Sequence, residues 1–198
     1  MPPVTDARTL ERKRSPLIIV GILALLVAGL GGGAGLLVRY QPIVRGSSGL
    51  FPSGKAVPST DPSDDRPTYL VTYVDGKTTT FGFSIRNSGR WGVPIVGLEA
   101  STTGMLDQFM YRLSDSGFTT DKGPFKAFAL APQAEQAIKV IARFWNCESY
   151  VVGGSAGMES VNVRFKVLGV ERSTSVPLGE RIEVMSPPNA NCPRPRAA

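Results

Sequence analysis

The residues from Gly153 to Gly157 are the most direct candidates for chemistry, because they read Gly-Gly-Ser-Ala-Gly. This matches the pattern G-x-S-x-G, in which a serine on a sharp turn between a strand and a helix acts as a nucleophile. Such a serine needs a base, usually histidine, and the chain contains no histidine. A serine–lysine pair would avoid that need, but the sequence brings no particular lysine to Ser155. The pattern therefore indicates a glycine-rich loop between two strands.

A phosphate-binding loop is suggested by the stretch from Gly49 to Ala56, which matches G-x-x-x-x-G-K. Ala56 stands where the motif needs Ser or Thr to hold magnesium. No strand is predicted before it, and Pro58 and Pro62 follow where the helix should begin. Nucleotide binding is therefore not predicted.

Metal sites are not predicted either. Asp61, Asp64 and Asp65 lack the Gly and Glu spacing of a calcium loop. The methionines that could form a copper site share no common spacing and have no histidine beside them. These methionines are Met105, Met110, Met158 and Met185.

Two carboxylates in one cleft can hydrolyse glycosides, and Asp107 with Glu99 is the pair that such a mechanism would use. Their sequence positions do not place them in one cleft. Histidine is the commonest general base near neutral pH and the commonest ligand of transition metals, so its absence removes many mechanisms. We therefore predict that the chain is not an enzyme, with no catalytic residue, no cofactor and no metal ion.

A ligand face could be formed by arginines that lie close to aromatic residues in the sequence. Arginine binds anions through two hydrogen bonds, and aromatic rings stack on sugars and cations. Ordinary surface arginines beside core aromatics would give the same pattern, and the sequence does not show that they share a face. The residues of this candidate face are Arg86, Arg90, Trp91 and Arg112.

The run from Leu17 to Val38 is apolar and uncharged. At about 1.5 Å per residue its helix would be about 33 Å long, enough to cross a hydrocarbon core of about 30 Å. Basic residues precede it, at Arg8, Arg12, Lys13 and Arg14, so the N-terminus should face the cytoplasm and the rest should face outward. We predict a signal-anchor in the cell membrane, with a cleaved signal peptide as the alternative.

Small residues between Gly29 and Gly35 give overlapping G-x-x-x-G matches within this run. Gly29 and Gly33 would let two helix backbones approach closely, so a homodimer paired through the helix is one hypothesis. A helix end that is merely rich in small residues is the alternative.

Cys147 and Cys192 both fall on the predicted outer side, where disulfides persist, so we predict that they pair. Two free thiols are the alternative. The net charge of +6 mildly favours anionic partners such as lipid head groups or wall polymers. Beyond the apolar run no basic residues alternate with aromatics, so no nucleic acid partner is predicted.

The remaining sequence favours strands. Asp75-Gly76 between two runs of β-branched and aromatic residues predicts a hairpin of 68–74 with 77–86. Period-two alternation predicts further strands over 91–100, 108–113, 125–130 and 134–145, and Val161 to Val167 is the clearest. A last pair of short strands should end near Val184.

Seven or eight short antiparallel strands predict an all-β, immunoglobulin-like β-sandwich preceded by one transmembrane helix. Prolines in the stretch before the sandwich favour a spacer that holds the domain away from the bilayer. The predicted order is a cytoplasmic tail over 1–15, the helix over 16–38, the spacer over 39–67, the sandwich over 68–186 and a proline-rich tail over 187–198.

The passage from Phe81 to Gly89, followed by Val93-Pro94-Ile95, resembles a strand-Asn-x-Gly-strand segment of bacterial extracytoplasmic immunoglobulin-like domains. The full layout is similar to single-pass membrane-anchored proteins of actinobacteria that carry such a domain. The resemblance implies no activity, so no site residue is transferred from it. We expect a non-enzymatic interaction or accessory module for another envelope protein. The alternative is a binding module for cell-wall glycan or another anionic polymer.

Overall fold

The computed structural model describes residues 40–53, 56–59, 67–100, 104–145 and 153–186. All regular secondary-structure elements within these ranges are β-strands, which confirms the predicted all-β class. Across the same ranges no helix is long and apolar enough to cross a membrane. Several predictions concern residues outside the described ranges: the apolar run with Gly29 and Gly33, the pair Cys147 and Cys192, and Asp61, Asp64 and Asp65.

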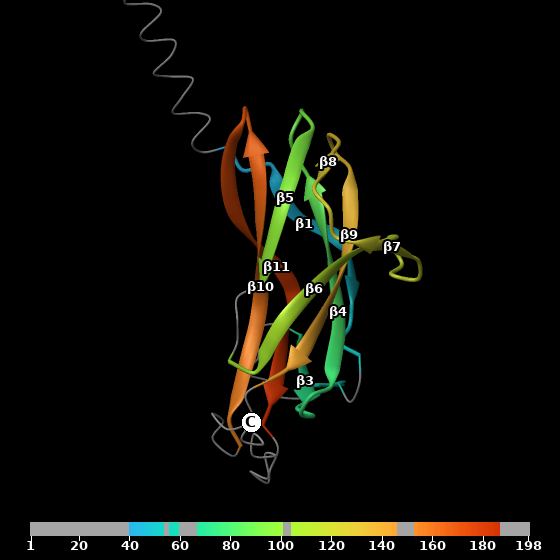
Figure 1. Ribbon diagram of the computed structural model, residues 1–198, viewed down its shortest axis with the longest axis vertical. Helices are drawn as coiled ribbons and strands as arrows, with labels where there is room; N and C mark the ends of the chain where they lie inside the picture. Colours follow the sequence, from blue (N-terminus) through green and yellow to red (C-terminus); the bar gives the residue numbers. More distant parts are fainter. Residues whose placement is uncertain (1–39, 54–55, 60–66, 101–103, 146–152, 187–198) are drawn as a thin grey trace, which may run out of the picture. The chain divides into compact units, whose positions relative to one another are not determined.

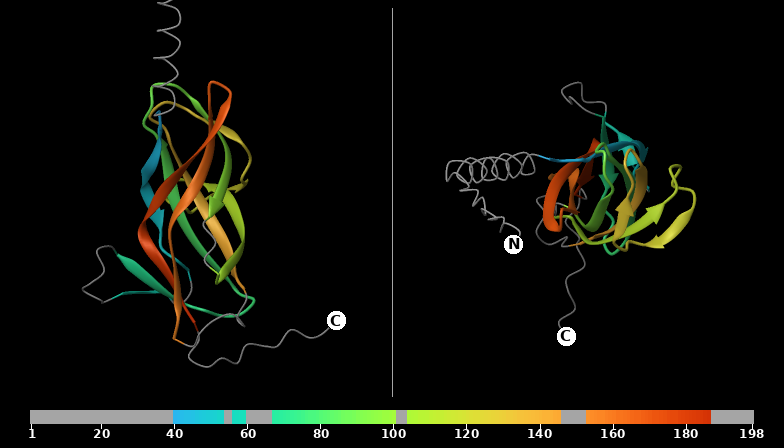
Figure 2. Two further views of the ribbon diagram at one scale, coloured as in Figure 1. Left: turned by 90° about the vertical axis from the view of Figure 1, so that its left-hand side faces the viewer. Right: turned by 90° about the horizontal axis from the view of Figure 1, so that it is seen from above.

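Two sheets form the sandwich (Figure 1, Figure 2). The five-stranded sheet has the order β1 (Ile43–Leu50), β4 (Thr78–Asn87), β9 (Glu135–Phe144), β6 (Leu106–Ser114), β7 (Asp121–Pro124). The six-stranded sheet has the order β2 (Ala56–Pro58), β3 (Thr68–Thr72), β11 (Val170–Met185), β10 (Ser155–Val167), β5 (Val93–Ala100), β8 (Phe128–Leu130).

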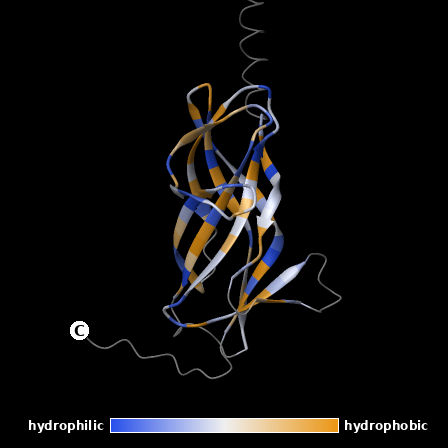
Figure 3. Ribbon diagram, turned by 90° about the vertical axis from the view of Figure 1, so that its right-hand side faces the viewer, coloured by the Kyte–Doolittle hydropathy of each residue, from blue (hydrophilic) through white to orange (hydrophobic). Residues whose placement is uncertain are grey.

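The core lies between the sheets and is built from alternate residues of the central strands. Such alternation places every second side chain on the inner face of a sheet, and Figure 3 shows it as bands of apolar residues along the strands. The inner faces of the central strands are completely or nearly completely buried. They comprise Phe81, Phe83 and Ile85 on β4, Ile138, Val140 and Ala142 on β9, and Val161, Val163 and Phe165 on β10.

The predicted hairpin between 68–74 and 77–86 is wrong. The turn itself exists, because the amide of Lys77 donates to the carbonyl of Val74 at 3.1 Å and Gly76 has a φ of 65°. However, β3 belongs to the six-stranded sheet and β4 to the five-stranded sheet, so the chain crosses between layers here. Both edges of β4 are occupied by β1 and β9, which leaves no place for β3 beside it.

Two strands lie inside the stretch predicted as a spacer. β1 pairs with β4, and β2 pairs with β3. β1 has an irregularity between Arg45 and Gly49, where the amides of Ser47 and Ser48 donate to the Glu135 carboxylate at 2.9 and 3.1 Å. The Glu135 carboxylate, far away in the sequence, thus accepts hydrogen bonds from the irregular part of β1, where the regular pairing with β4 is interrupted. The domain therefore begins earlier than residue 68.

The prediction of two short strands at the end of the domain is wrong. The structure has one long strand there, β11, and its pairing with β10 is irregular opposite Glu159. Gly179 lies at this point with a φ of 93°, and a Cβ there would overlap the Arg45 guanidinium. β11 also pairs with β3 in parallel, so the sandwich is not purely antiparallel. The described ranges contain eleven strands rather than the seven or eight predicted.

Candidate functional site

The sandwich has two ends, which we name after residues that mark them. The Ile43 end is where β1 begins and β4 ends, because Ile43 pairs with Asn87, and the β4–β5 loop follows there. Figure 1 shows the β10–β11 turn at the same end. The Val74 end holds the β3–β4 turn, the last residue of β9 and the first residue of β10. In Figure 1 the Ile43 end is at the top and the Val74 end at the bottom.

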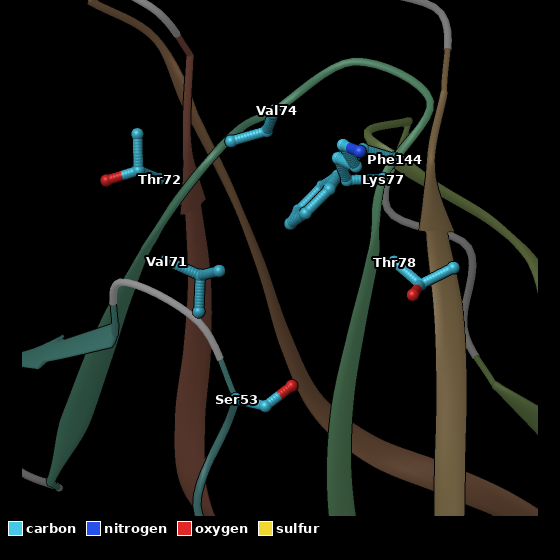
Figure 4. Close-up of a pocket in the computed structure, with 7 residues that line it drawn as sticks. All are labelled: Ser53, Val71, Thr72, Val74, Lys77, Thr78 and Phe144. Atoms are coloured by element: carbon cyan, nitrogen blue, oxygen red, sulfur yellow. The ribbon is translucent and has the colours of Figure 1, made fainter.

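A pocket of about 190 Å³ opens at the Val74 end, between β3 and the start of β4 (Figure 4). Its apolar floor comes from Val71 and Phe144, which are 2% and 4% exposed. Phe144 is fixed by its amide, which donates to the Lys77 carbonyl at 2.9 Å, and by ring contact with Tyr73 at 5.3 Å between centroids. The remaining lining residues are Ser53, Thr72, Val74, Lys77 and Thr78.

Exposed apolar side chains lie around this pocket. Val74 on its lining is 46% exposed. Phe51, two residues before Ser53, is 57% exposed and contacts the Tyr69 ring at 5.0 Å between centroids. An apolar pocket with an exposed apolar rim is the usual form of a surface that binds another molecule.

The polar groups of the pocket are few. The Tyr73 hydroxyl donates to the Asp75 carboxylate at 2.7 Å, which holds the turn beside the pocket. Ser53 is held by β4, because the Thr80 amide donates to its hydroxyl at 2.9 Å. Lys77 supplies a cation at the pocket wall. These groups can orient a bound side chain, and the pocket contains no acid–base pair.

The predicted ligand face is divided by the structure. Arg86 is the next-to-last residue of β4 and donates to the Gln133 side chain at 2.9 Å, while Arg90 and Trp91 follow in the β4–β5 loop at the Ile43 end. Arg112 lies on β6, two strands away from β4, and forms an ion pair with Asp121. Arg86, Arg90 and Trp91 therefore lie at or beside the β4–β5 loop, whereas Arg112 lies on a different strand and is not part of the same face.

The other candidates for chemistry also lie apart. Ser155 begins β10 rather than a helix, and its hydroxyl donates to Glu183 on the neighbouring strand. Glu99 lies on β5 and pairs with Arg164 at 3.2 Å, whereas Asp107 lies on β6 of the other sheet. In the described part of the chain, no three His, Cys, Asp or Glu residues are grouped as a metal site would need.

Asn87 has a structural role that no motif in the sequence indicates. It is fully buried at the end of β4. Its side-chain amide donates to the carbonyls of Trp91, Leu130 and Ala131 at 2.8, 3.0 and 3.2 Å, and its oxygen accepts from the Gly89 amide at 2.9 Å. Asn87 thus joins two loops at the Ile43 end.

Tyr111 links the two sheets. It lies on β6, and its hydroxyl oxygen accepts a hydrogen bond from the Ala100 amide of β5 at 2.5 Å. Burial raises the pKa of Tyr111 to about 12, because the phenolate would lose solvation. The Tyr111 hydroxyl is therefore neutral at physiological pH, and its hydrogen bond connects the two sheets.

No protein-family model matches the chain, and no curated protein matches it. Among solved structures, a PapD-like domain of human CEP192 aligns at TM-score 0.32 and 11% identity over 59% of this chain and 80% of that chain. The apo PCuAC domain from PmoF1 aligns at 0.30 and 13%, over 67% of this chain and 96% of that one. The cupredoxin domain of amoB from Nitrosocaldus yellowstonii aligns at 0.28 and 12%, over 61% and 65%. Similarity at this level transfers no ligand or activity.

Proposed function

We propose that this protein is a non-enzymatic, membrane-anchored module whose extracytoplasmic β-sandwich binds another envelope protein through the Val74 end. The apolar run Leu17–Val38 and the basic residues before it support the anchor and its orientation. The pocket at the Val74 end, with its apolar floor and exposed apolar rim, is the observation that carries the interaction.

The size of the pocket favours a side chain of a partner over a free small molecule. Pockets for small ligands enclose about 300–1,000 Å³, and this one holds about 190 Å³. One aliphatic side chain buried there would contribute roughly 1.5–3 kcal/mol. A specific interface needs further contacts around such an anchor, and Val74 on the pocket lining and Phe51, which contacts Tyr69 of β3, can supply them.

Photocrosslinking in cells tests this proposal. A photoreactive residue replaces Val74 in the full-length protein, and a matched control replaces Met110, which is 54% exposed on β6 away from the pocket. We expect one discrete protein adduct at Val74 and none at Met110. Thr72→Phe, which fills the pocket from its exposed wall, should abolish the adduct, whereas Thr72→Val should retain it.

Two results would count against the interaction. Identical adducts at both probe positions would show random collision, and an adduct that persists with Thr72→Phe would show that the pocket is not the contact. Extraction of the protein from membranes by alkaline carbonate would independently overturn the membrane anchor.

A further inference from the structure

The structure leaves little chain between the predicted membrane helix and the folded domain. The carbonyl of Pro42 already accepts hydrogen bonds from the Ser88 amide at 2.8 Å and the Ser88 hydroxyl at 3.0 Å. The apolar run ends at Val38. The residues between them span about 14 Å at most when fully extended. The proposed membrane anchor therefore leaves only residues 39–41 to separate the bilayer from the Ile43 end.

Leu168 lies at the tip of the β10–β11 turn, at this same end. It is 80% exposed and has a φ of 49°, followed by Gly169 with a φ of 81°. A tight turn with two positive φ angles favours Asn, Asp or Gly at its first central position, and leucine is unfavourable there. The backbone of Leu168 is strained and its side chain is exposed, a combination that motivates a role in binding.

Two further exposed apolar residues lie at this end of the six-stranded sheet. Val170 is 59% exposed and Trp91 is 68% exposed. Ile95 of β5 pairs with Phe165 of β10, so the residues before β5 and those after β10 lie at one end of the sheet, as Figure 1 also shows. Tryptophan is enriched at membrane interfaces because its ring is amphipathic.

The charges at this end suit an anionic surface. Arg86, Arg90 and Lys166 are exposed there. Nearby acids already have partners: Glu171 accepts from Arg164 at 3.3 Å, and Glu135 is bound by the amides of β1. Basic groups near a bilayer are attracted to anionic head groups.

The geometry points to a second docking surface: the Ile43 end lies on the anionic lipid bilayer, with Leu168 and Trp91 in the interface. This inference rests on the proposed membrane anchor and adds to it the orientation of the domain. The sandwich would stand with the Ile43 end on the membrane and the pocket of the Val74 end facing outward. β4 alone, which connects these ends, spans about 30 Å at about 3.3 Å per residue.

Quenching of tryptophan fluorescence by brominated lipids tests the orientation. The chain has two tryptophans, so Trp145→Phe leaves Trp91 as reporter and Trp91→Phe leaves Trp145 at the opposite end. Full-length protein is reconstituted in phosphatidylcholine vesicles with or without phosphatidylglycerol. We expect quenching of Trp91 to exceed that of Trp145 several-fold, and to increase with phosphatidylglycerol.

Leu168→Asn separates docking from folding. Asparagine suits the turn, so the melting temperature should rise or stay unchanged, while quenching of Trp91 should fall. Val57→Asn is the matched control, because Val57 is 58% exposed on β2 near the other end. It should leave the quenching of Trp91 unchanged.

The outcomes distinguish docking from anchoring. Two results would overturn the docking but leave the anchor intact, provided that the protein stays with the vesicles after alkaline carbonate. One is equal quenching of both tryptophans, and the other is unchanged quenching of Trp91 in the Leu168→Asn variant. Stronger quenching of Trp145 would reverse the orientation and overturn the inference. No effect of phosphatidylglycerol would overturn the preference for an anionic surface. Loss of the protein from the vesicles would overturn the anchor itself.

Discussion

Replacing Asn87 with alanine should strongly destabilise the sandwich. The side-chain amide has two hydrogens that serve three buried or half-buried carbonyl oxygens, and the side-chain oxygen accepts a fourth hydrogen bond from Gly89. Alanine removes these four hydrogen bonds at a position whose side chain is fully buried. At roughly 1 kcal/mol or more for each lost bond, the expected loss in the free energy of unfolding is about 3–4 kcal/mol.

Thermal unfolding of the full-length protein in detergent, followed by circular dichroism, measures this loss. For a domain of this size, about 3 kcal/mol corresponds to a fall of roughly 10 °C in the melting temperature. Asn162→Ala is the control, because Asn162 is exposed on β10 and surface substitutions usually change stability by less than about 0.5 kcal/mol. If Asn87→Ala and Asn162→Ala melted at the same temperature, Asn87 would not be the link between the loops.

Two further predictions concern packing and ionisation. The phenolate of Tyr111 should form only near pH 12. Because burial raises the pKa of Tyr111 in the folded state, the neutral hydroxyl stabilises the fold fully below pH 10, and this stabilisation is lost as the pH rises through 12. Ultraviolet difference titration against Tyr111→Phe checks this, and a midpoint near 10 would contradict it. Gly82→Ala should destabilise by roughly 1–3 kcal/mol, because its Cβ would overlap the buried Phe118 ring. Phe118→Leu should recover part of the loss in the double variant, as measured by denaturant unfolding; simple additivity would refute this contact.

The sequence predicted the central strands because their pattern is local. In β10 the alternation of Val161, Val163 and Phe165 with polar residues determines which face is buried, whatever the partner strands are. The same holds for β9.

Predictions failed where structure depends on distant residues. The turn at Asp75-Gly76 was predicted correctly, but a turn does not determine whether the chain returns in the same sheet or crosses to the other. β1 has few apolar residues, and it pairs where the Glu135 carboxylate, far away in the sequence, binds its amides. No local pattern contains that information.

The candidate sites show the same limit. The pocket at the Val74 end combines Ser53, Val71 and Phe144, which come from three separate parts of the chain and carry no shared motif. Leu168 could have been noticed, because a leucine before glycine in a tight turn between two strand patterns is unusual. Its exposure, and the place of the β10–β11 turn at the Ile43 end, are known only from the structure.

The most direct test of the two-ended arrangement compares photoreactive residues at Val74 and Leu168 of the full-length protein in the same cells. If the domain has this two-ended arrangement, Val74 gives protein adducts and Leu168 gives lipid adducts. Protein adducts from Leu168, with lipid adducts or none from Val74, would contradict it.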